Sequence, residues 1–209
     1  MAQVCQVSAL YSYSIGFLSK TKPKGRKENP MATKVITGKC RASYVHLFEP
    51  YGQNGNKAKY SVSLIIPKND TDTIGKIEAA IKEAMENGKS KWGGKIPPNL
   101  KTPLRDGDAE RPDDPVYKNT CFINATTDDR PGVVDRRRVP ITDPTVVYSG
   151  CYIRASINMY PFNSNGNRGV ACGLQNVQFW DDGDPLNGRL RAEDEFDTLD
   201  VDDDEDFLS

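Results

Sequence analysis

The sequence has few of the residues that build metal sites and disulfide frameworks. It contains a single histidine, His46, and its five cysteines are widely spaced, with no C-x-x-C pair. Zinc sites and disulfide scaffolds need closely spaced Cys and His, so neither is predicted. Four of the cysteines lie in apolar, strand-like sequence and are expected to be small core residues in a reducing cytosol. They are Cys40, Cys121, Cys151 and Cys172.

Long apolar runs and the common catalytic motifs are also missing. No apolar run approaches the roughly 18 to 20 residues that a membrane helix needs, so no membrane segment is predicted. The chain has neither a G-x-x-x-x-G-K-S/T phosphate loop nor a G-x-S-x-G nucleophile elbow. Asp128, Asp129 and Asp135 lie among turn residues, where aspartate mostly makes turns. We therefore expect no enzyme, no cofactor and no metal. A metal-dependent nuclease or resolvase that uses these three aspartates is the alternative.

Positive charge is absent from the end of the chain. Residues 192–209 contain ten carboxylates and no lysine or arginine, and they close on the apolar tip Phe207 and Leu208. The 28 basic residues all lie at or before Arg191, where they face 19 of the 29 acidic ones, so that part carries +9 and the tail −10. The tail cannot bury enough apolar surface to offset its ordering entropy and is predicted to be disordered. This charge division indicates a nucleic-acid binder with its own competitor, and a purely solubilising tail is the alternative.

The first thirty residues are expected to be a poorly ordered extension. An apolar stretch precedes a lysine- and arginine-rich one, which is the reverse of the order in a secretory signal. Asn29-Pro30 then precedes a clean strand pattern, so Met31 is expected to begin the protein or its folded domain. A basic arm that contacts phosphates is the alternative for residues 1–30. Residues 31–191 suffice for one domain with its own core.

Hydrophobic alternation predicts most of the strands. One long strand is expected from Thr33 to Phe48, with a bulge at Gly38. After a turn-rich loop, a second strand over 59–66 alternates apolar and polar residues until Pro67 ends it. These two strands are expected to form a half-buried hairpin. Further strands are predicted over residues 121–126, 151–160 and about 170–180.

One helix is inserted among these strands. It is expected to begin at a cap on Asp70 or Thr71 and to end at Asn87-Gly88, with apolar residues at helical spacing between them. Residues 89–118, rich in proline, glycine and charge, form a long irregular excursion of the kind that is usually functional or mobile. Five strands with one inserted helix and long loops predict a mainly β, OB-like barrel better than an α/β sheet.

The outer face of the predicted barrel is the candidate site. Odd positions over 151–160 are apolar, so even positions should face outward, as should Phe122, Asn124 and Thr126. An outer face that mixes aromatic rings with lysine and arginine suits single-stranded nucleic acid, because every base has a π-face and every linkage a charge. The candidate DNA-binding residues are Lys39, Arg41, Lys59, Trp92, Phe122, Arg130, Arg137 with its neighbours Arg136 and Arg138, Tyr152, Arg154 and Tyr160. The alternatives are a core position for Trp92 and burial of Phe122 and Tyr160 under the long loop.

Five segments carry a resemblance to a known family. They are Met31-Ala32-Thr33-Lys34-Val35, Tyr44-Val45-His46-Leu47-Phe48-Glu49-Pro50, Arg130-Pro131-Gly132-Val133-Val134-Asp135, Tyr148-Ser149-Gly150-Cys151-Tyr152 and Gly173-Leu174-Gln175-Asn176-Val177. Together they resemble the single-stranded DNA-binding proteins of tailed bacteriophages, over about residues 31–191. The acidic end is similar in style to the tails of bacterial and phage proteins of that kind.

The resemblance implies an OB-fold protein that coats single strands during phage replication or recombination, in the cytoplasm of the infected bacterial host. It implies a tail that recruits replication proteins such as a polymerase or helicase. The tail residues expected to bind partners are Asp203, Asp204, Asp206, Phe207 and Leu208. In related proteins the aromatic tip is commonly the last residue, whereas Leu208 and Ser209 follow Phe207 here.

The expected mechanism is binding without chemistry. Lysine and arginine would release counterions from the DNA backbone, aromatic rings would stack on bases, and sequence preference would be weak. The tail is expected to occupy the same basic groove in the free protein until DNA displaces it. Edge strands and the tail both permit a homodimer. A virion assembly protein with a solubilising tail is a further alternative.

Overall fold

The chain folds around one β-sheet. The computed structural model describes residues 33–52, 55, 57–164 and 166–186, and in that part eight strands belong to a single sheet. The strands are β1 (Thr33–Ile36), β2 (Cys40–Tyr51), β3 (Lys59–Pro67), β4 (Leu104–Asp106), β5 (Thr120–Thr127), β6 (Gly132–Val134), β7 (Tyr152–Ser164) and β8 (Asn167–Asp181). The helices are α1 (Thr71–Asn87), α2 (Gly107–Glu110) and the 3-10 helices η1 (Lys89–Trp92) and η2 (Pro115–Tyr117).

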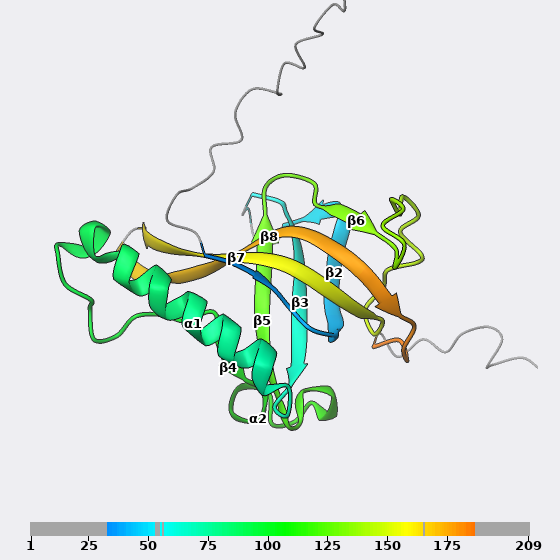
Figure 1. Cartoon of the computed structure of the whole chain (residues 1–209), viewed down its shortest axis with the longest axis horizontal. Coiled ribbons are helices and arrows are strands. Elements are labelled where there is room, and N and C mark those ends of the chain that lie inside the picture. Colours follow the sequence, from blue (N-terminus) through cyan, green and yellow to red (C-terminus); the bar gives the residue numbers. More distant parts are fainter. Residues whose placement is uncertain (1–32, 53–54, 56, 165, 187–209) are drawn as a thin grey trace, which may run out of the picture.

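Five of these strands close into a barrel. β7, β2, β3, β5 and β8 are neighbours in that order, and β8 pairs with β7 again, which completes the ring. β5 and β8 pair in parallel, whereas the other neighbours in the ring are antiparallel. Figure 1 shows β7 and β8 curving across one side of the barrel, in front of β2, β3 and β5. The predicted mainly β, OB-like barrel with an inserted helix is confirmed, and β1, β4 and β6 are short additions to it.

Strict alternation along β7 separates the core from the outer face. Ile153, Ala155, Ile157 and Met159 are buried, and the even-numbered residues between them are partly exposed, as the odd and even positions predict. β3 and β5 pair with the same parity, so Leu64 lies opposite Ile123 inside the barrel. Each fully buried aliphatic side chain contributes about 1.5–3 kcal/mol relative to an exposed one. The apolar positions of the ring strands therefore form one continuous core.

The predicted long strand from Thr33 to Phe48 is two strands instead. The break falls at residues 37–39: β1 pairs with the middle of β7, at residues 156–159, whereas β2 pairs with its first two residues. Gly38 lies in the break, where its N–H donates to Thr73 Oγ1 at 2.9 Å. A Cβ at Gly38 would lie 2.8 Å from side-chain oxygens of Asp70 and Thr73, so the chain passes the helix there without a side chain. The predicted bulge at Gly38 is thus a strand boundary.

Helix α1 begins and ends where the sequence predicts. Asp70 is the N-cap, and its Oδ1 accepts a hydrogen bond from the Thr73 N–H at 3.0 Å. At the other end the Gly88 N–H donates to Ala84 O. The helix packs against β1, β7 and β8, as Figure 1 shows beside the barrel, and its buried Ile77 and Ile81 join the barrel core.

The excursion over residues 89–118 is more ordered than predicted. It contains η1, β4, α2 and η2, and β4 pairs with β5. Lys68, just after β3, donates to Asp106 at 2.9 Å and to Asp108 at 2.6 Å. Those hydrogen bonds hold the pKa of both carboxyls below the usual value. The excursion is thereby held against the end of the β3–β5 pair, where it covers part of the outer face.

Several predictions concern residues outside the described ones. They include the disorder of residues 1–30 and 192–209 and the partner-binding tail residues Asp203, Asp204, Asp206, Phe207 and Leu208. The domain boundaries at residues 31 and 191 stay predictions. Within the described ranges, none of the helices is long and apolar enough to cross a membrane.

The cysteines provide a test of the packing. Cys40, Cys151 and Cys172 are buried, whereas Cys121 is partly exposed. Burial raises the pKa of the Cys40 and Cys151 thiols to about 11 and that of Cys172 further, so little thiolate forms at pH 8. In a Cys5→Ser variant titrated with a thiol reagent at pH 8, one thiol should react readily and three only after denaturant is added. Rapid reaction of all four in the native protein would contradict this packing.

Candidate functional site

A hollow with aromatic walls lies on the outer face of the barrel, over β2, β3 and β5. We call it the β3 groove. Its volume is about 420 Å³, and it is lined by Tyr44, His46, Tyr51, Ser61, Val62, Ser63, Arg111, Asn124 and Thr126. Since β3 neighbours neither β7 nor β8 in the ring, the groove lies on the side of the barrel opposite those two strands. Outer-face strands of OB-folds are a common surface for oligonucleotides.

The floor of the groove follows from the register of β3 and β5. Ser61 pairs with Thr126 and Ser63 pairs with Asn124, so these four side chains share the outward face. Their apolar neighbours along each strand point into the core. The outward direction of Asn124 and Thr126 was predicted from alternation and is confirmed. The result is a floor of small, neutral polar groups.

An irregularity in β2 places an aromatic wall beside that floor. The register between β2 and β3 shifts between Ser43 and His46, and Tyr44 in the shift has φ of +48°. This left-handed backbone is strained for a residue with a large side chain. A bulge of this kind re-aims a side chain, and the Tyr44 ring is 54% exposed at the groove. The Val45 N–H donates to Ser149 Oγ at 3.2 Å, which helps to hold the bulge.

Arg111 reaches the groove from the excursion. Its Nη1 donates to the Tyr44 hydroxyl at 2.9 Å, and its guanidinium lies 5.3 Å from the centre of the Tyr44 ring and 4.8 Å from that of Tyr117. The hydrogen bond to Tyr44 raises the pKa of Arg111. The excursion therefore delivers a permanent positive charge to one end of the groove.

The opposite end of the groove carries a stacked pair of rings and two lysines. His46 and Tyr51 are stacked with centroids 4.5 Å apart and planes 7° apart, and Tyr51 is 50% exposed. Lys59 lies opposite Tyr51 in the β2–β3 register. Lys57 and Lys59 share Asp128, at 3.2 and 3.7 Å. Aromatic surface and net positive charge thus meet at this end.

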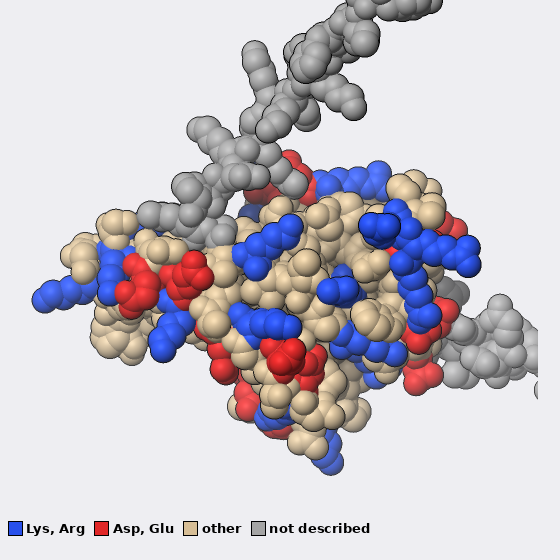
Figure 2. Space-filling model, viewed as in Figure 1, with Lys and Arg blue, Asp and Glu red and all other residues tan. Residues whose placement is uncertain are grey.

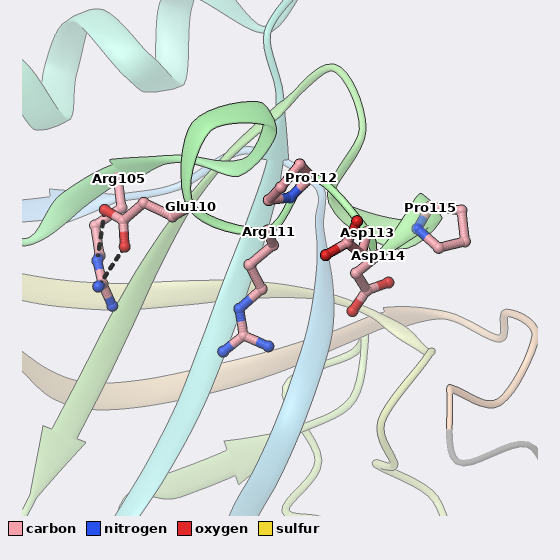
Figure 3. A pocket seen from close by; sticks show the side chains of 7 residues that line it. All are labelled: Arg105, Glu110, Arg111, Pro112, Asp113, Asp114 and Pro115. Atoms are coloured by element: carbon pink, nitrogen blue, oxygen red, sulfur yellow. Dashed lines mark hydrogen bonds and ion pairs between the residues drawn. The ribbon is translucent and has the colours of Figure 1, made fainter.

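A second hollow continues beyond Arg111. It has a volume of about 680 Å³ and is lined by Arg105 and residues 110–115. Figure 3 shows Arg111 extending over β3 and β2, with the Arg105–Glu110 pair to one side and Asp113 and Asp114 to the other. Arg105 Nε donates to Glu110 at 2.9 Å. Because the carboxylates here offset the arginines, this hollow suits a polyanion less well than the β3 groove does.

Several predicted contact residues lie on the other side of the barrel and have partners of their own. Lys39 pairs with Asp181 at 3.5 Å and lies 4.2 Å from the centre of the Tyr152 ring. Arg41 donates to the carbonyl oxygens of Gly150 at 3.3 Å and Asp184 at 2.9 Å. Lys39 and Arg41 therefore also hold the chain together where β2, β7 and β8 meet.

Arg154, on the outer face of β7, donates to the Thr37 carbonyl oxygen at 3.1 Å. Tyr160, on the same face, is partly buried, and this burial raises the pKa of its hydroxyl. Figure 2 shows lysine and arginine spread over the side of β7 and β8, with a denser group towards β6 and the end of β8.

The remaining predicted cations lie near the ends of the barrel. Arg130 is exposed, with its guanidinium 5.9 Å from the centre of the Phe48 ring. Arg137 is exposed in a turn, where its backbone N–H donates to Asp135 Oδ1 at 2.8 Å. Of the predicted set, only Lys59 borders the β3 groove directly through its pairing with Tyr51.

Two predicted contact residues are not exposed, and their assignment to the outer surface is wrong. Phe122 has the predicted outward direction, but the excursion covers it, so it is 1% exposed and packs edge-on against Tyr117. Trp92 is 6% exposed, and its Nε1 donates to Phe162 O at 2.9 Å. Trp92 fills the space beside Gly88, as its core alternative predicts. Neither ring can stack on a base in this conformation.

The aspartates of the nuclease alternative are distributed among other roles. Asp128 pairs with two lysines, and Asp135 Oδ1 accepts from the N–H groups of Arg137 and Val139 at 2.8 and 2.7 Å. Among the described residues, no three His, Cys, Asp or Glu side chains gather as a metal site would require. Asp135 acts as the turn residue that the sequence predicts.

Sequence reasoning missed the residues that form the walls of the groove. Tyr44, His46, Tyr51 and Arg111 are absent from the predicted DNA-binding residues. Tyr44 is re-aimed by a bulge, and Arg111 is brought in by a tertiary contact, so simple alternation signals neither. The available signal in the sequence is a pair of tyrosines, Tyr44 in the predicted strand and Tyr51 in the loop that follows it.

Comparison with known proteins gives consistent matches. Residues 33–208 match the family described as Enterobacter phage Enc34, ssDNA-binding protein. The chain is 34% identical over 188 residues to protein p50 of Acyrthosiphon pisum secondary endosymbiont phage 1, covering 84% of this chain and 99% of that protein.

Solved structures of phage single-stranded DNA-binding proteins are similar to this chain. The single-stranded DNA-binding protein from bacteriophage Enc34, in complex with ssDNA, matches with a TM-score of 0.64 and 27% identity, covering 73% of this chain and 89% of that one. Gp2.5, a single-stranded DNA-binding protein of bacteriophage T7, shares the fold with a TM-score of 0.55 and 16% identity, covering 85% of this chain and 99% of that one.

The bulge at Tyr44 generates a stability prediction. Both Tyr44→Gly and Tyr44→Ala lose the ring. Glycine adopts a positive φ at little cost, whereas alanine keeps the backbone strain. Tyr44→Gly should therefore be more stable than Tyr44→Ala by about 1 kcal/mol, measured by urea unfolding. At an ordinary β-strand position alanine is the more stable of the two. An alanine variant at least as stable as the glycine variant would show that residue 44 is not left-handed in solution.

Proposed function

Because the chain belongs to the family of phage single-stranded DNA-binding proteins represented by that of Enterobacter phage Enc34, we propose that it binds single-stranded DNA in the β3 groove without regard to sequence. The observation that carries this proposal is the combination of exposed aromatic walls and flanking cations on the outer face of three barrel strands. Binding is the whole activity, with no chemical step on the DNA.

The groove supplies the two interactions that single strands need. Tyr44 and the stacked His46–Tyr51 pair offer ring faces to the bases, and stacking contributes about 1–3 kcal/mol per base whatever its identity. Arg111 at one end and Lys59 at the other are placed to neutralise phosphates as the strand passes. Counterion release then makes the affinity fall as salt rises.

The predicted residues outside the groove are proposed as secondary contacts. Tyr152, Tyr160, Lys39 and Arg154 lie on the opposite side of the ring, so they would meet a strand only after it leaves the groove. Arg130 and Arg137 lie in the segment between β5 and β7 and could extend such a path. These residues would add electrostatic attraction more than stacking, since most of their rings and charges already have protein partners.

The acidic tail is proposed to compete with DNA for the groove. Leu186, the last described residue, donates its N–H to Ser149 O at 2.8 Å and shares a hollow of about 230 Å³ with Tyr44 and Tyr117. The chain therefore reaches its last described residue beside the groove. An extended chain covers about 3.3 Å per residue, so residues 187–191 can span up to roughly 17 Å, which would bring the tail carboxylates within reach of the groove.

In the cell we propose that the protein coats single strands during phage replication or recombination, in the cytoplasm of the infected host. DNA entering the groove would release the tail, and Asp203, Asp204, Asp206, Phe207 and Leu208 would then be available to a replication protein such as a polymerase or helicase. The tail carries carboxylates and an apolar tip, so it would fit a partner surface that is basic and contains an apolar pocket. A homodimer is compatible with this arrangement.

Substitution of groove rings tests the location of the site. Tyr44→Ala and Tyr51→Ala should each weaken binding of a fluorescent ~30-nucleotide single strand by about 1–3 kcal/mol, measured by anisotropy. Tyr152→Ala is the matched control on the other side of the barrel and should lose much less. The matching duplex should bind poorly to all forms. A large loss for Tyr152→Ala with none for the two groove variants would place the strand on the β7 side.

Deletion of the tail tests the competition. A chain ending at Arg191 should bind single strands more tightly than the full chain at low salt, because ten carboxylates no longer oppose the DNA. The difference should shrink as salt rises, since the tail's attraction to the groove is screened. Equal affinity of the two chains at low salt would contradict the competition.

A further inference from the structure

The floor of the β3 groove carries a chemistry that stacking and phosphate neutralisation do not use. Ser61, Ser63, Asn124 and Thr126 stand in two paired rows on the outward face of β3 and β5. Every one of these side chains can both donate and accept a hydrogen bond, and none is charged. A floor that contacted only the phosphate backbone of DNA would carry cations. Here the cations lie at the two ends of the groove.

The floor also contains an unused hydrogen-bonding group. Ser63 is 4% exposed, lines the groove, and its hydroxyl has no hydrogen-bond partner among the described residues. Buried hydroxyls are normally partnered, by protein or by a bound molecule. The Asn124 side chain, paired across from Ser63, is exposed into the same hollow. Asn124 therefore presents its amide to the hollow, and the covered, unpartnered hydroxyl of Ser63 lies across from it in the floor.

We propose that the β3 groove reads the Watson–Crick edge of an unpaired base, with Asn124 as the central contact and the hydroxyls of Ser61, Ser63 and Thr126 beside it. This inference rests on the proposed function and specifies which part of the DNA the site recognises. Tyr44 on one side and His46–Tyr51 on the other bound the slot that such a base enters.

The amide of Asn124 explains how an edge contact stays tolerant of sequence. A carboxamide presents one donor and one acceptor side by side, and rotation by 180° exchanges them. The Watson–Crick edge of each base also presents adjacent donors and acceptors, so either orientation of the amide finds a match. Rotatable serine and threonine hydroxyls adapt in the same way. In a duplex those edges are already paired, so the contact selects single strands by chemistry as well as by shape.

The test uses bases whose edge is blocked. Oligomers of ~12 residues, within the range of OB-fold site sizes, are titrated into the full chain by anisotropy competition. Thymidine is compared with N3-methylthymidine, which keeps the phosphates and the stacking ring but loses the edge N–H. Deoxyuridine, which lacks the methyl group on the opposite edge, controls for bulk. The N3-methyl oligomer should bind about tenfold more weakly or worse, and deoxyuridine about as well as thymidine.

A variant links the effect to the floor. Asn124→Ala should weaken thymidine binding and reduce the preference over the N3-methyl oligomer. Asn176→Ala removes an exposed amide from β8 on the opposite side of the ring and should leave both unchanged.

If thymidine and N3-methylthymidine oligomers bind equally well, edge reading is wrong and DNA binding by stacking and charge still stands. If Asn124→Ala leaves the N3-methyl discrimination intact, the floor does not read the edge. If no oligomer binds the full chain, the proposed function fails and this inference fails with it.

Discussion

The pairing of β7 with β8 closes the sheet into a ring, and the site depends on that closure. A closed five-stranded ring has a small interior, so inward positions must be apolar and outward positions are left for other uses. The rows Leu64–Ile123 and Val62–Ala125 fill the interior, and the rows Ser63–Asn124 and Ser61–Thr126 alternate with them outside. The polar floor of the β3 groove is thus the reverse side of the hydrophobic core.

Two departures from regular structure turn that floor into a groove. The bulge at Tyr44 costs backbone strain and directs a ring outward, where a regular strand would continue its alternation. The excursion held by Lys68 buries Phe122 and delivers Arg111 to the Tyr44 hydroxyl. The excursion thus removes one ring from the surface and secures another at the edge of the groove. Both devices act at the same end of the site.

Formal charge is a poor guide to the charge that a ligand meets. The part of the chain before the tail carries a net +9, yet Lys39, Lys68 and Arg41 have carboxylate or carbonyl partners within the fold. The cations at the groove are fewer and are placed at its ends. Leu186, the last described residue, shares a hollow with Tyr44, and the ten carboxylates of residues 192–209 follow it in the sequence.

Much of the fold could be predicted because it rests on local patterns. Alternation over 151–160 gave the faces of β7, Pro67 ended β3, and Asp70 capped α1 as expected. The resemblance to phage single-stranded DNA-binding proteins, carried by five short segments, is confirmed by the family match. The break at Gly38 was missed, because whether a run of β-formers is one strand or two depends on which neighbours it pairs with.

By itself the sequence determined the alternation of core and surface, the cap and length of the one long helix, the separation of charge and the family. These follow from residue type and spacing, which act over a few neighbours. Only the tertiary structure decided which outward residues gather into a site. Phe122 is covered because Tyr117 of the excursion packs edge-on against it. Tyr44 is directed outward by the bulge in β2 and meets Arg111 across 67 positions of the chain. Contacts of that range are set by the closure of the barrel, and no local pattern encodes them.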